Sequence, residues 1–302
     1  MPVSKMPHYD SGLQKLTPDL YTYLLYNGTW GLANTTFLVG KESVLLVDTL
    51  MYGSIIQPFL KKFRETTNKP VRYLVNTHSH GDHTNGNEDF KSSTIISHVN
   101  CFNEMKANKA AAEERARNPV ARPAAPAPSW RTPQIAAELE KVNITFPNFM
   151  VNESATIHLD DTEVQLLHYG PGHTGGDLVV FFPKYGIVAV GDLGFFYCTP
   201  NLTPFGSVKN WIVITEKILA LDADKYISGH GPIGGKAALK EQQEYLEFVF
   251  DAAKKGVKEG IKSSEAAKRL NLGAYAQWGE AERITGAMGT AYRDLGAVAL
   301  VG

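Results

Sequence analysis

Four segments of this chain place a side chain that can bind a metal ion beside a glycine, just after an apolar stretch typical of a β-strand. They are residues 76–87 (NTHSHGDHTNGN), 170–176 (GPGHTGG), 191–192 (GD) and 228–232 (SGHGP). Glycine lets the backbone turn sharply, so each polar side chain can stand at the end of its strand. This recurrence favours a fold that gathers several strand ends around metal ions.

The first segment contains the pattern H-x-H-x-D-H. His78 and His80 are two residues apart at the end of a strand, so their side chains point the same way and can bind one ion. Gly81 then frees Asp82 and His83 to reach a second ion nearby. Imidazole and carboxylate groups suit Zn²⁺, and also Fe or Mn. Because four ligands cannot complete two sites, further candidates are needed, and the other segments offer His173, Asp192 and His230.

The hydrophobic pattern predicts an α/β protein. Aromatic and β-branched runs broken by glycine or asparagine predict strands at 21–26, 35–39, 44–47, 71–76, 94–97, 155–159, 164–169, 178–182, 187–190 and 225–228. Helical spacing predicts helices at 54–63, with Ser54 as N-cap, and at 208–221, 236–255 and 263–270. Residues 37–48 and 181–192 are weak repeats of one another, each two strands followed by aspartate. Two similar halves with outer helices predict a four-layer αββα sandwich of two mixed sheets.

The length of 302 residues is compatible with one domain over the whole chain, 1–302. Residues 101–149 form an expected insertion near the site, because an Ala/Glu/Lys/Arg-rich helical stretch is followed there by a proline-rich stretch that cannot continue a helix. Residues 236–302 form an expected C-terminal helical extension, although the pattern of its glycine-rich end predicts no definite element.

Composition narrows the partners and the compartment. A formal net charge of −1 gives no sign of a nucleic-acid or membrane partner, and we expect a small-molecule substrate. The two cysteines, Cys101 and Cys198, cannot make a disulfide framework or a four-thiolate zinc site. Residues 1–10 lack the apolar region of a secretory signal, and no apolar stretch is long enough to span a membrane, so we expect a cytoplasmic protein. The oligomeric state is left open.

In this order, the motifs H-x-H-x-D-H, G-H-T, G-D and G-H-G resemble the metallo-β-lactamase superfamily of dinuclear metal hydrolases, over roughly residues 20–235. The resemblance implies one metal on His78, His80 and His173, and a second on Asp82, His83 and His230, with Asp192 bridging both. Many zinc β-lactamases have a cysteine at the place of Asp192 and a lysine at that of Phe195. In its aspartate, the chain looks more like the lactonase, glyoxalase II and ribonuclease branches.

We therefore expect an enzyme with two Zn²⁺ ions, Fe or Mn being possible, in which a metal-bound hydroxide attacks a small lactone, lactam, ester or amide. The resemblance implies that Asp82 accepts the proton and passes it to the leaving group. A thioesterase of the glyoxalase II type is the nearest alternative, followed by an iron-dependent oxidoreductase and a metal-dependent nuclease. The nuclease is disfavoured because the insertion holds only seven Lys/Arg against five Glu. A non-catalytic metal-binding protein is the remaining class.

Weaker candidates surround this set. Asp48 matches the aspartate that the family has after an early strand, where it would hydrogen-bond a ligand or its loop, although a structural turn is the alternative. His98 is expected to cap a helix or pack in the core, and His8, His158 and His168 lack ligand spacing. Cys198 is expected to be a buried thiol. Possible substrate contacts, which could equally pack the insertion onto the body, are Trp30, Trp130, Phe146, Phe149 and Tyr197.

Overall fold

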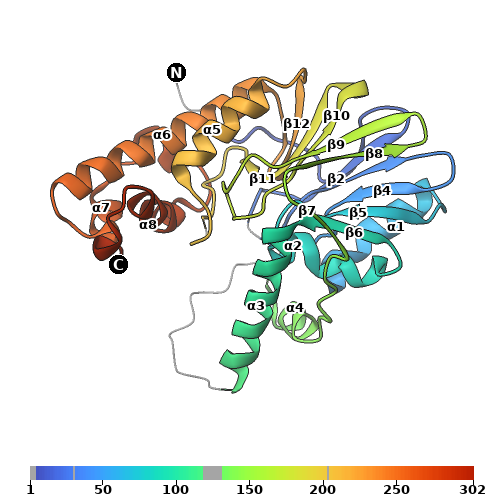
Figure 1. Cartoon of the computed structure of the whole chain (residues 1–302), viewed down its shortest axis with the longest axis horizontal. Coiled ribbons are helices and arrows are strands. Elements are labelled where there is room, and N and C mark those ends of the chain that lie inside the picture. The colour runs from blue at the N-terminus through green and yellow to red at the C-terminus, as the bar shows by residue number, and fades with distance from the viewer. Residues whose placement is uncertain (1–4, 30, 118–130, 203) are drawn as a thin grey trace.

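The computed structural model describes residues 5–29, 31–117, 131–202 and 204–302, so Trp30 and Trp130 lie outside the described residues. Two mixed sheets face each other (Figure 1). The seven-stranded sheet has the order β1 (Gly12–Lys15), β2 (Leu20–Leu24), β3 (Thr35–Val39), β4 (Val44–Val47), β5 (Val71–Val75), β6 (Thr94–His98), β7 (Phe149–Val151). The six-stranded sheet has the order β13 (Ile233–Gly234), β12 (Lys225–His230), β11 (Ile187–Phe195), β10 (Val179–Phe182), β9 (Thr162–Leu167), β8 (Ser154–Leu159).

Helices cover the outer faces of both sheets (Figure 1). The α-helices are α1 (Gln57–Thr66), α2 (Gly81–Thr84), α3 (Val99–Arg117), α4 (Pro133–Leu139), α5 (Val208–Leu219), α6 (Lys236–Lys258), α7 (Ser263–Arg269) and α8 (Ile284–Asp294). Short 3-10 helices are η1 (Gly53–Ile55), η2 (Asn85–Phe90), η3 (Pro183–Tyr185), η4 (Gly273–Gln277), η5 (Ala281–Arg283) and η6 (Val298–Leu300). The α3 helix projects away from the sandwich.

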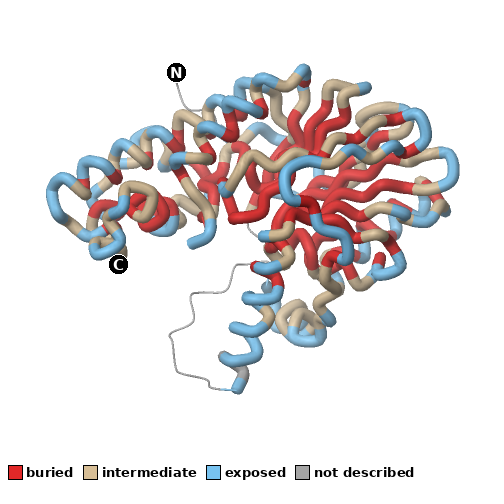
Figure 2. The backbone as a smooth tube through the Cα atoms, viewed as in Figure 1, coloured by how far each residue is buried: buried red, intermediate tan, exposed pale blue. Residues whose placement is uncertain are grey.

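Strand alternation sorts the side chains into layers. In β4, Leu45 and Val47 join the cluster between the sheets, whereas Val44 and Leu46 join an outer cluster with Phe59 of α1. This is the two-residue period of a strand buried on both faces. Figure 2 shows the same result as a continuous buried centre that follows the strands, with exposed backbone at their tips. The predicted four-layer αββα sandwich is confirmed.

The second sheet is sorted in the same way. Ile187 and Ala189 of β11 face the first sheet, whereas Val188 and Val190 lie in the outer cluster with Trp211 of α5. Side chains of α6 and α8 complete that outer cluster, so the segment 236–302 supplies much of the cover of this sheet. None of the helices in the described part of the chain is long and apolar enough to cross a membrane.

The helix predicted at 54–63 is shifted. Ser54 lies in η1 and is not a cap, and α1 runs from Gln57 to Thr66. Pro58 explains the shift, because proline is tolerated in the first turn of a helix, where its missing N–H has no partner to lose. The strand predicted at 187–190 continues to Phe195, which carries the G-D motif inside the strand.

Candidate metal centre

The H-x-H-x-D-H segment leaves β5 after Val75 and forms a loop followed by the single turn of α2. Its two ends are tied together. Asn76 Nδ2 donates to Asn87 Oδ1 at 3.0 Å, and Asn87 Nδ2 donates to Asn76 Oδ1 at 2.8 Å. Both side chains are fully buried, so this reciprocal amide pair fixes the loop on which four candidate ligands lie. The sequence interpretation missed this pair.

The first cluster consists of His78, His80, His173 and Asp192, whose candidate ligand atoms all lie within 4.8 Å of one another. Asp192 Oδ2 lies 3.5 Å from His78 Nε2 and 3.2 Å from His173 Nε2. His173 comes from the loop between β9 and β10, and its Nε2 lies 3.0 Å from His80 Nδ1. Three imidazole nitrogens and a carboxylate therefore converge on one point.

The second cluster consists of Asp82, His83 and His230. His230 ends β12, and its Nε2 lies 3.3 Å from Asp82 Oδ2. The other carboxylate oxygen of Asp192, Oδ1, lies 3.0 Å from His83 Nε2 and 3.5 Å from His230 Nε2. Asp192 thus directs one oxygen to each cluster. The structure brings together all seven ligand candidates of the sequence, in the predicted division.

The tautomers of the histidines suit metal ions. Thr77 Oγ1 lies 3.1 Å from His78 Nδ1, Asp48 Oδ2 lies 2.8 Å from His83 Nδ1, and the carbonyl oxygen of Thr29 lies 3.1 Å from His230 Nδ1. An acceptor at Nδ1 holds the proton there and leaves the Nε2 lone pair for the centre. Buried His78 Nε2 makes no hydrogen bond within the described residues. The residues present therefore fit two divalent metal ions.

Burial and mutual charge shift the pKa values in this centre. Burial, together with the neighbouring His173, lowers the pKa of His80 to about 3. Burial alone would lower the pKa of His230, but the carboxylates of Asp192 and Asp82 raise it to about 9. Burial alone would raise the pKa of Asp192, yet the surrounding histidines, His230 first, hold it well below its usual range. The centre is thus a buried array of carboxylates and imidazoles, which is the ligand chemistry of zinc or iron.

Asp48 lies beneath the ligands, as the sequence predicted for a residue that hydrogen-bonds a ligand or its loop. Its Oδ1 accepts a hydrogen bond from Thr77 N at 2.8 Å, and its Oδ2 accepts one from Thr77 Oγ1 at 2.7 Å in addition to facing His83. The backbone of Asp48 has a φ of 61°, a left-handed conformation that aspartate and asparagine tolerate better than most residues.

Gly229 and Gly191 explain why two of the ligand motifs contain glycine. A Cβ atom on Gly229 would overlap Asp192 Oδ1, so no other residue leaves room for that carboxylate. Gly191 has a φ of 53°, and the parallel pairing of β11 with β12 changes register on both sides of it. This irregularity turns the Asp192 side chain toward the metal centre.

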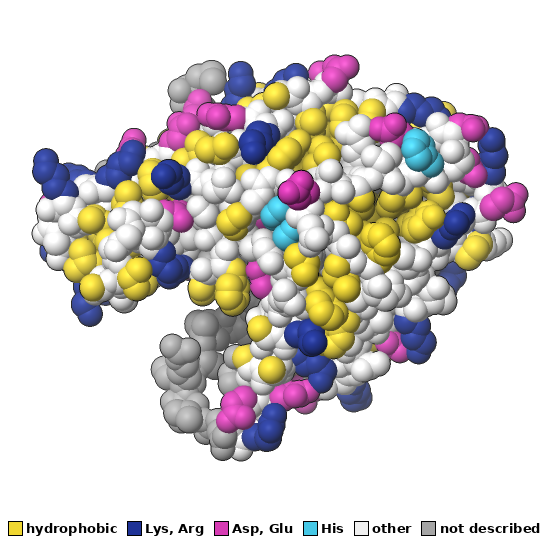
Figure 3. Space-filling view, in the orientation of Figure 1, with side chains coloured by type: hydrophobic (Ala, Val, Ile, Leu, Met, Phe, Trp, Pro, Cys, Tyr) yellow, Lys and Arg dark blue, Asp and Glu magenta, His cyan; other side chains and the backbone are white. Residues whose placement is uncertain are grey.

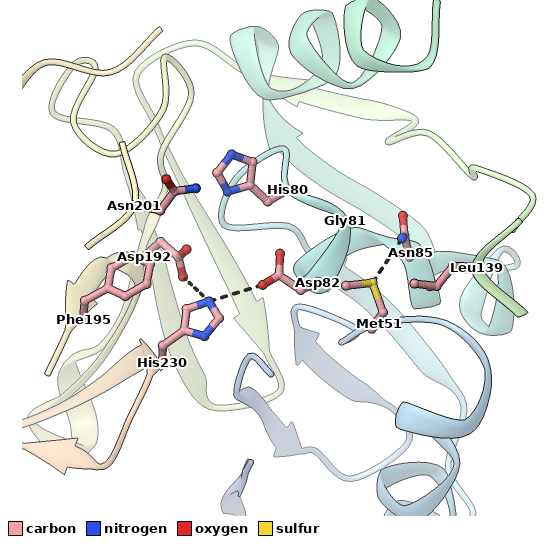
Figure 4. A pocket seen from close by; sticks show the side chains of 10 residues that line it. All are labelled: Met51, His80, Gly81, Asp82, Asn85, Leu139, Asp192, Phe195, Asn201 and His230. Carbon is pink, nitrogen blue, oxygen red and sulfur yellow. Dashed lines mark hydrogen bonds and ion pairs between the residues drawn. The ribbon is translucent and has the colours of Figure 1, made fainter. Parts of the chain in front are cut away.

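A pocket of about 330 Å³ opens on the centre, and Figure 4 shows its lining. His80, Asp82, Asp192 and His230 form its floor. The other lining residues belong mainly to its walls and are Met51, Gly81, Asn85, Leu139, Phe195 and Asn201. The sequence did not identify any of these six as a substrate contact.

Two side chains shape the pocket from opposite sides. The ring of Phe195 stacks on His230, with ring centroids 4.8 Å apart and planes at 10°. Leu139 comes from α4 of the predicted insertion, and α4 is attached to η1 through Glu138, which accepts hydrogen bonds from Ser54 N at 2.7 Å and Ser54 Oγ at 2.6 Å. The insertion therefore reaches the site, and among its described residues the one that lines the pocket is Leu139, not an aromatic side chain.

The predicted aromatic contacts lie elsewhere. Phe149 was expected near the substrate, but it lies on edge strand β7, is 52% exposed and lines a separate groove with Ile157 and Leu166. Phe146 contacts Phe102 of α3, with ring centroids 6.0 Å apart. Tyr197 packs against the cluster over the second sheet. These three do not line the metal pocket, because each side chain is occupied by packing or lies on the wrong edge of the sandwich.

The remaining candidates have structural surroundings. His98 Nδ1 accepts a hydrogen bond from Asn100 N at 3.1 Å at the start of α3, which confirms the predicted cap. His98 also stacks on His168, with ring centroids 3.7 Å apart. Cys198 is buried, as predicted, and burial raises the pKa of its thiol to about 12.

A four-layer αββα sandwich that carries two adjacent His/Asp clusters at its strand ends defines a protein of the metallo-β-lactamase type. A model of the metallo-beta-lactamase superfamily matches residues 28–230. The chain belongs to this superfamily, as its motifs predicted.

Relatives within the superfamily differ in their activities. The chain is 25% identical over 203 residues to the alpha subunit of 2,4-dinitroanisole O-demethylase from Nocardioides sp. (strain JS1661). The aligned stretch covers 67% of this chain and 53% of that protein. It is 25% identical over 195 residues to metallo-beta-lactamase type 2 from Elizabethkingia meningoseptica. That alignment covers 61% of this chain and 66% of that protein. The chain thus spans about half of the first relative.

A solved structure shows the same fold. The stereoselective inverting sec-alkylsulfatase Pisa1 from Pseudomonas sp. superposes with a TM-score of 0.70 at 19% identity, covering 94% of this chain and 50% of that one.

Proposed function

We propose that this protein is a dinuclear metal-dependent hydrolase, with zinc as the expected metal, that acts on a small uncharged carboxylic derivative such as a lactone, lactam, ester or amide. The observation that carries the proposal is the position of Asp192, which offers one oxygen to each ligand cluster at the floor of an open pocket. Asp192 would help to hold a metal ion at each cluster, and such ions would supply the chemistry of a two-metal hydrolase.

The protein side chains have separable parts in the reaction. Metal ions held by the two clusters would activate water and polarise the oxygen of the bond to be cleaved. Asp82 accepts a hydrogen bond from Gly31 N at 2.8 Å and lines the pocket, so it stays oriented toward a bound substrate. Burial would raise the pKa of Asp82, but His230 and His83 hold it well below its usual range. Asp82 is thus ionised and can take up a proton for transfer to the leaving group.

The pocket lining supports an uncharged substrate. Among the described residues that line it, none is a lysine or arginine, and Met51, Leu139 and Phe195 give it apolar walls. A sulfate or carboxylate group would have to be held by the metal ions and by neutral donors such as the amides of Asn85 and Asn201, with no cationic side chain, beside the carboxylates of Asp82 and Asp192. For this reason we favour an acyl compound over the sulfate esters that the name of the alkylsulfatase relative implies.

One face of the molecule offers no support for a nuclease. On the face in Figure 3, the cationic and anionic side chains are interspersed and form no continuous basic track. Phosphodiester substrates of nucleic-acid size need such a track for docking. Thioesters remain the nearest variant of the proposed substrate, because they present the same acyl carbon. We also propose a small-molecule substrate as the only partner of the reaction, and a cytoplasmic location.

The test is hydrolysis by protein reconstituted with two equivalents of zinc. An aryl acetate, a lactone, a lactam, a thioester and an alkyl sulfate are compared, each with wild type, His80→Ala and His158→Ala. His158 is exposed on β8, so His158→Ala controls for the loss of a histidine outside the site. We expect cleavage of at least one acyl substrate, lost after chelation and in His80→Ala and retained in His158→Ala. Cleavage of the alkyl sulfate alone, or acyl activity that survives chelation, would overturn the proposal.

A further inference from the structure

Glu104 is a buried carboxylate on α3, the helix that opens the predicted insertion. Only 7% of the residue is exposed, although α3 projects from the body and most of its further residues are exposed (Figures 1 and 2). No described lysine or arginine forms an ion pair with Glu104. A buried charge of this kind is costly unless hydrogen bonds compensate it, so its partners indicate why it is there.

Those partners are the two loops that carry the first ligand cluster. Glu104 Oε2 accepts a hydrogen bond from Ser79 Oγ at 2.7 Å, and Ser79 lies between His78 and His80. Glu104 Oε1 accepts one from Gly175 N at 2.8 Å, and Gly175 lies two residues after His173. One carboxylate therefore joins two loops that lie far apart in the chain. Glu104 is 25 residues after Ser79 and 71 residues before Gly175.

Close contacts at the start of α3 support the same junction. Asn100 Nδ2 donates to Gly175 O at 2.8 Å. A Cβ atom on Gly176 would overlap the backbone nitrogen of Cys101, so the loop and the helix touch backbone to backbone. The His173 loop is thus held against α3 on several atoms, and Glu104 extends that contact to Ser79.

We propose that Glu104 is a positioning residue that sets the distance between His80 and His173 and so determines the affinity of the first metal site. This rests on the metal centre of the proposed function. His80 Nδ1 and His173 Nε2 lie 3.0 Å apart and come from the two loops that Glu104 joins. Without the carboxylate, the loops lose charge-assisted hydrogen bonds on both sides, and the two imidazoles are free to separate. Neither of these hydrogen bonds of Glu104 goes to a residue of the second cluster, Asp82, His83 and His230, so we expect the second site to keep its affinity.

The test measures binding of Co²⁺ to metal-free protein, by its visible absorption and by competition with a chromophoric chelator. We expect Glu104→Ala to weaken one of two binding steps about 10–100-fold, the usual effect of losing a group that orients a ligand, and to leave the other step unchanged. Glu104→Gln should recover most of the affinity, because its amide oxygen can accept from Gly175 N and its NH₂ can donate to Ser79 Oγ. Glu113→Ala, an exposed position of the same helix, is the control and should bind as wild type.

A second variant keeps the proposal testable if Glu104→Ala does not fold. Ser79→Ala removes one of the two hydrogen bonds and should weaken the same step to a smaller extent. Unchanged binding in Ser79→Ala, or two unaltered steps in Glu104→Ala, would overturn the role of Glu104. If wild-type protein itself bound no Co²⁺, the proposed metal centre would fail instead, so the two failures are distinguishable.

Discussion

Asp48 contacts one ligand of each metal cluster, His83 directly and His78 through a hydroxyl. Its Oδ2 lies 2.8 Å from His83 Nδ1 and accepts from Thr77 Oγ1 at 2.7 Å, and that hydroxyl lies 3.1 Å from His78 Nδ1. One carboxylate thus sets the tautomer and direction of two imidazoles. We interpret Asp48 as the common support of the centre.

Replacing Asp48 should weaken metal binding without changing the ligands themselves. Asp48→Asn keeps a residue that tolerates the left-handed φ of 61° but places an amide where the carboxylate was. We expect metal affinity to fall about 10–100-fold, as is typical when a group that hydrogen-bonds a ligand is lost. Competition with a chelator measures it. Asp160 also has a positive φ, 54°, but lies outside the site, so Asp160→Asn is the control and should bind metal as wild type does. Equal metal affinity in the two variants would contradict the role of Asp48.

Leu139 should govern the size of the apolar part of the substrate. Leu139→Ala removes part of an apolar wall, so KM for acyl substrates with a long apolar group should rise about 3–30-fold, at about 0.8 kcal/mol per buried CH₂. The kcat for the smallest acyl substrate should change little, because no ligand is altered. Glu140→Ala, exposed at the end of the same helix, is the control. A uniform loss of kcat over all chain lengths would mean that Leu139 acts on the centre instead.

Gln242 should be essential for stability. Its side chain is fully buried, accepts a hydrogen bond from Phe195 N at 2.6 Å and donates one to Leu193 O at 2.7 Å, so α6 braces the end of β11 beside Asp192. Gln242→Ala leaves a buried N–H without its acceptor and creates a cavity, which should lower the free energy of unfolding by about 2–4 kcal/mol. Urea denaturation measures this. Gln243→Ala, only partly buried, should cost less than about 1 kcal/mol.

The metal-free protein should lose stability as the pH rises above neutrality. The pKa of His230 is raised to about 9, against about 6.5 in an unfolded chain. The folded state therefore binds the proton of His230 more tightly than the unfolded chain does. Protonated His230 stabilises the folded state fully below pH 6.5, and this stabilisation is lost as the pH rises to about 9. The slope is at most about 1.4 kcal/mol per pH unit for one proton.

Urea denaturation of metal-free protein at pH 6.5 and 8.5 measures this effect, and His230→Gln should reduce the slope. Metal affinity should change in the opposite direction and increase with pH, because metal ions displace the same protons. Metal-free stability that rises between these two pH values would contradict the charge arrangement around Asp192 and Asp82.

The ligand positions were predictable because their signals are local. A strand followed by glycine and histidine, as at His173 and His230, needs no distant partner to be recognised. The division into two clusters came from resemblance, and the structure reproduces it. The residues that support the ligands were only partly predictable. Asp48 follows a strand and could be identified there, but Glu104 lies in a helical stretch with no distinguishing pattern. Its role follows from its hydrogen bonds with Ser79 and Gly175.

The pocket walls and the C-terminal segment depend on contacts that spacing does not encode. Leu139 reaches the pocket because Glu138 binds Ser54, 84 residues away. Trp278 is buried because the last segment of the chain folds back onto the body. The ring centroid of Trp278 lies 5.3 Å from that of Tyr245, and the backbones of Cys198 and Gly279 pair in an isolated parallel β-bridge. Aromatic character alone suggested Phe149 as a substrate contact, and its place on an edge strand puts it in a separate groove, outside the metal pocket.

The stoichiometry of metal binding tests the central claim most directly. Metal-free protein is titrated with Zn²⁺, and the ions bound per chain are counted by native mass spectrometry. The two clusters that share Asp192 predict two ions in wild type and a loss of affinity at both sites in Asp192→Asn. Wild-type protein that binds a single ion or none, or an Asp192→Asn variant that binds two ions as tightly as wild type, would contradict a centre built on this shared carboxylate.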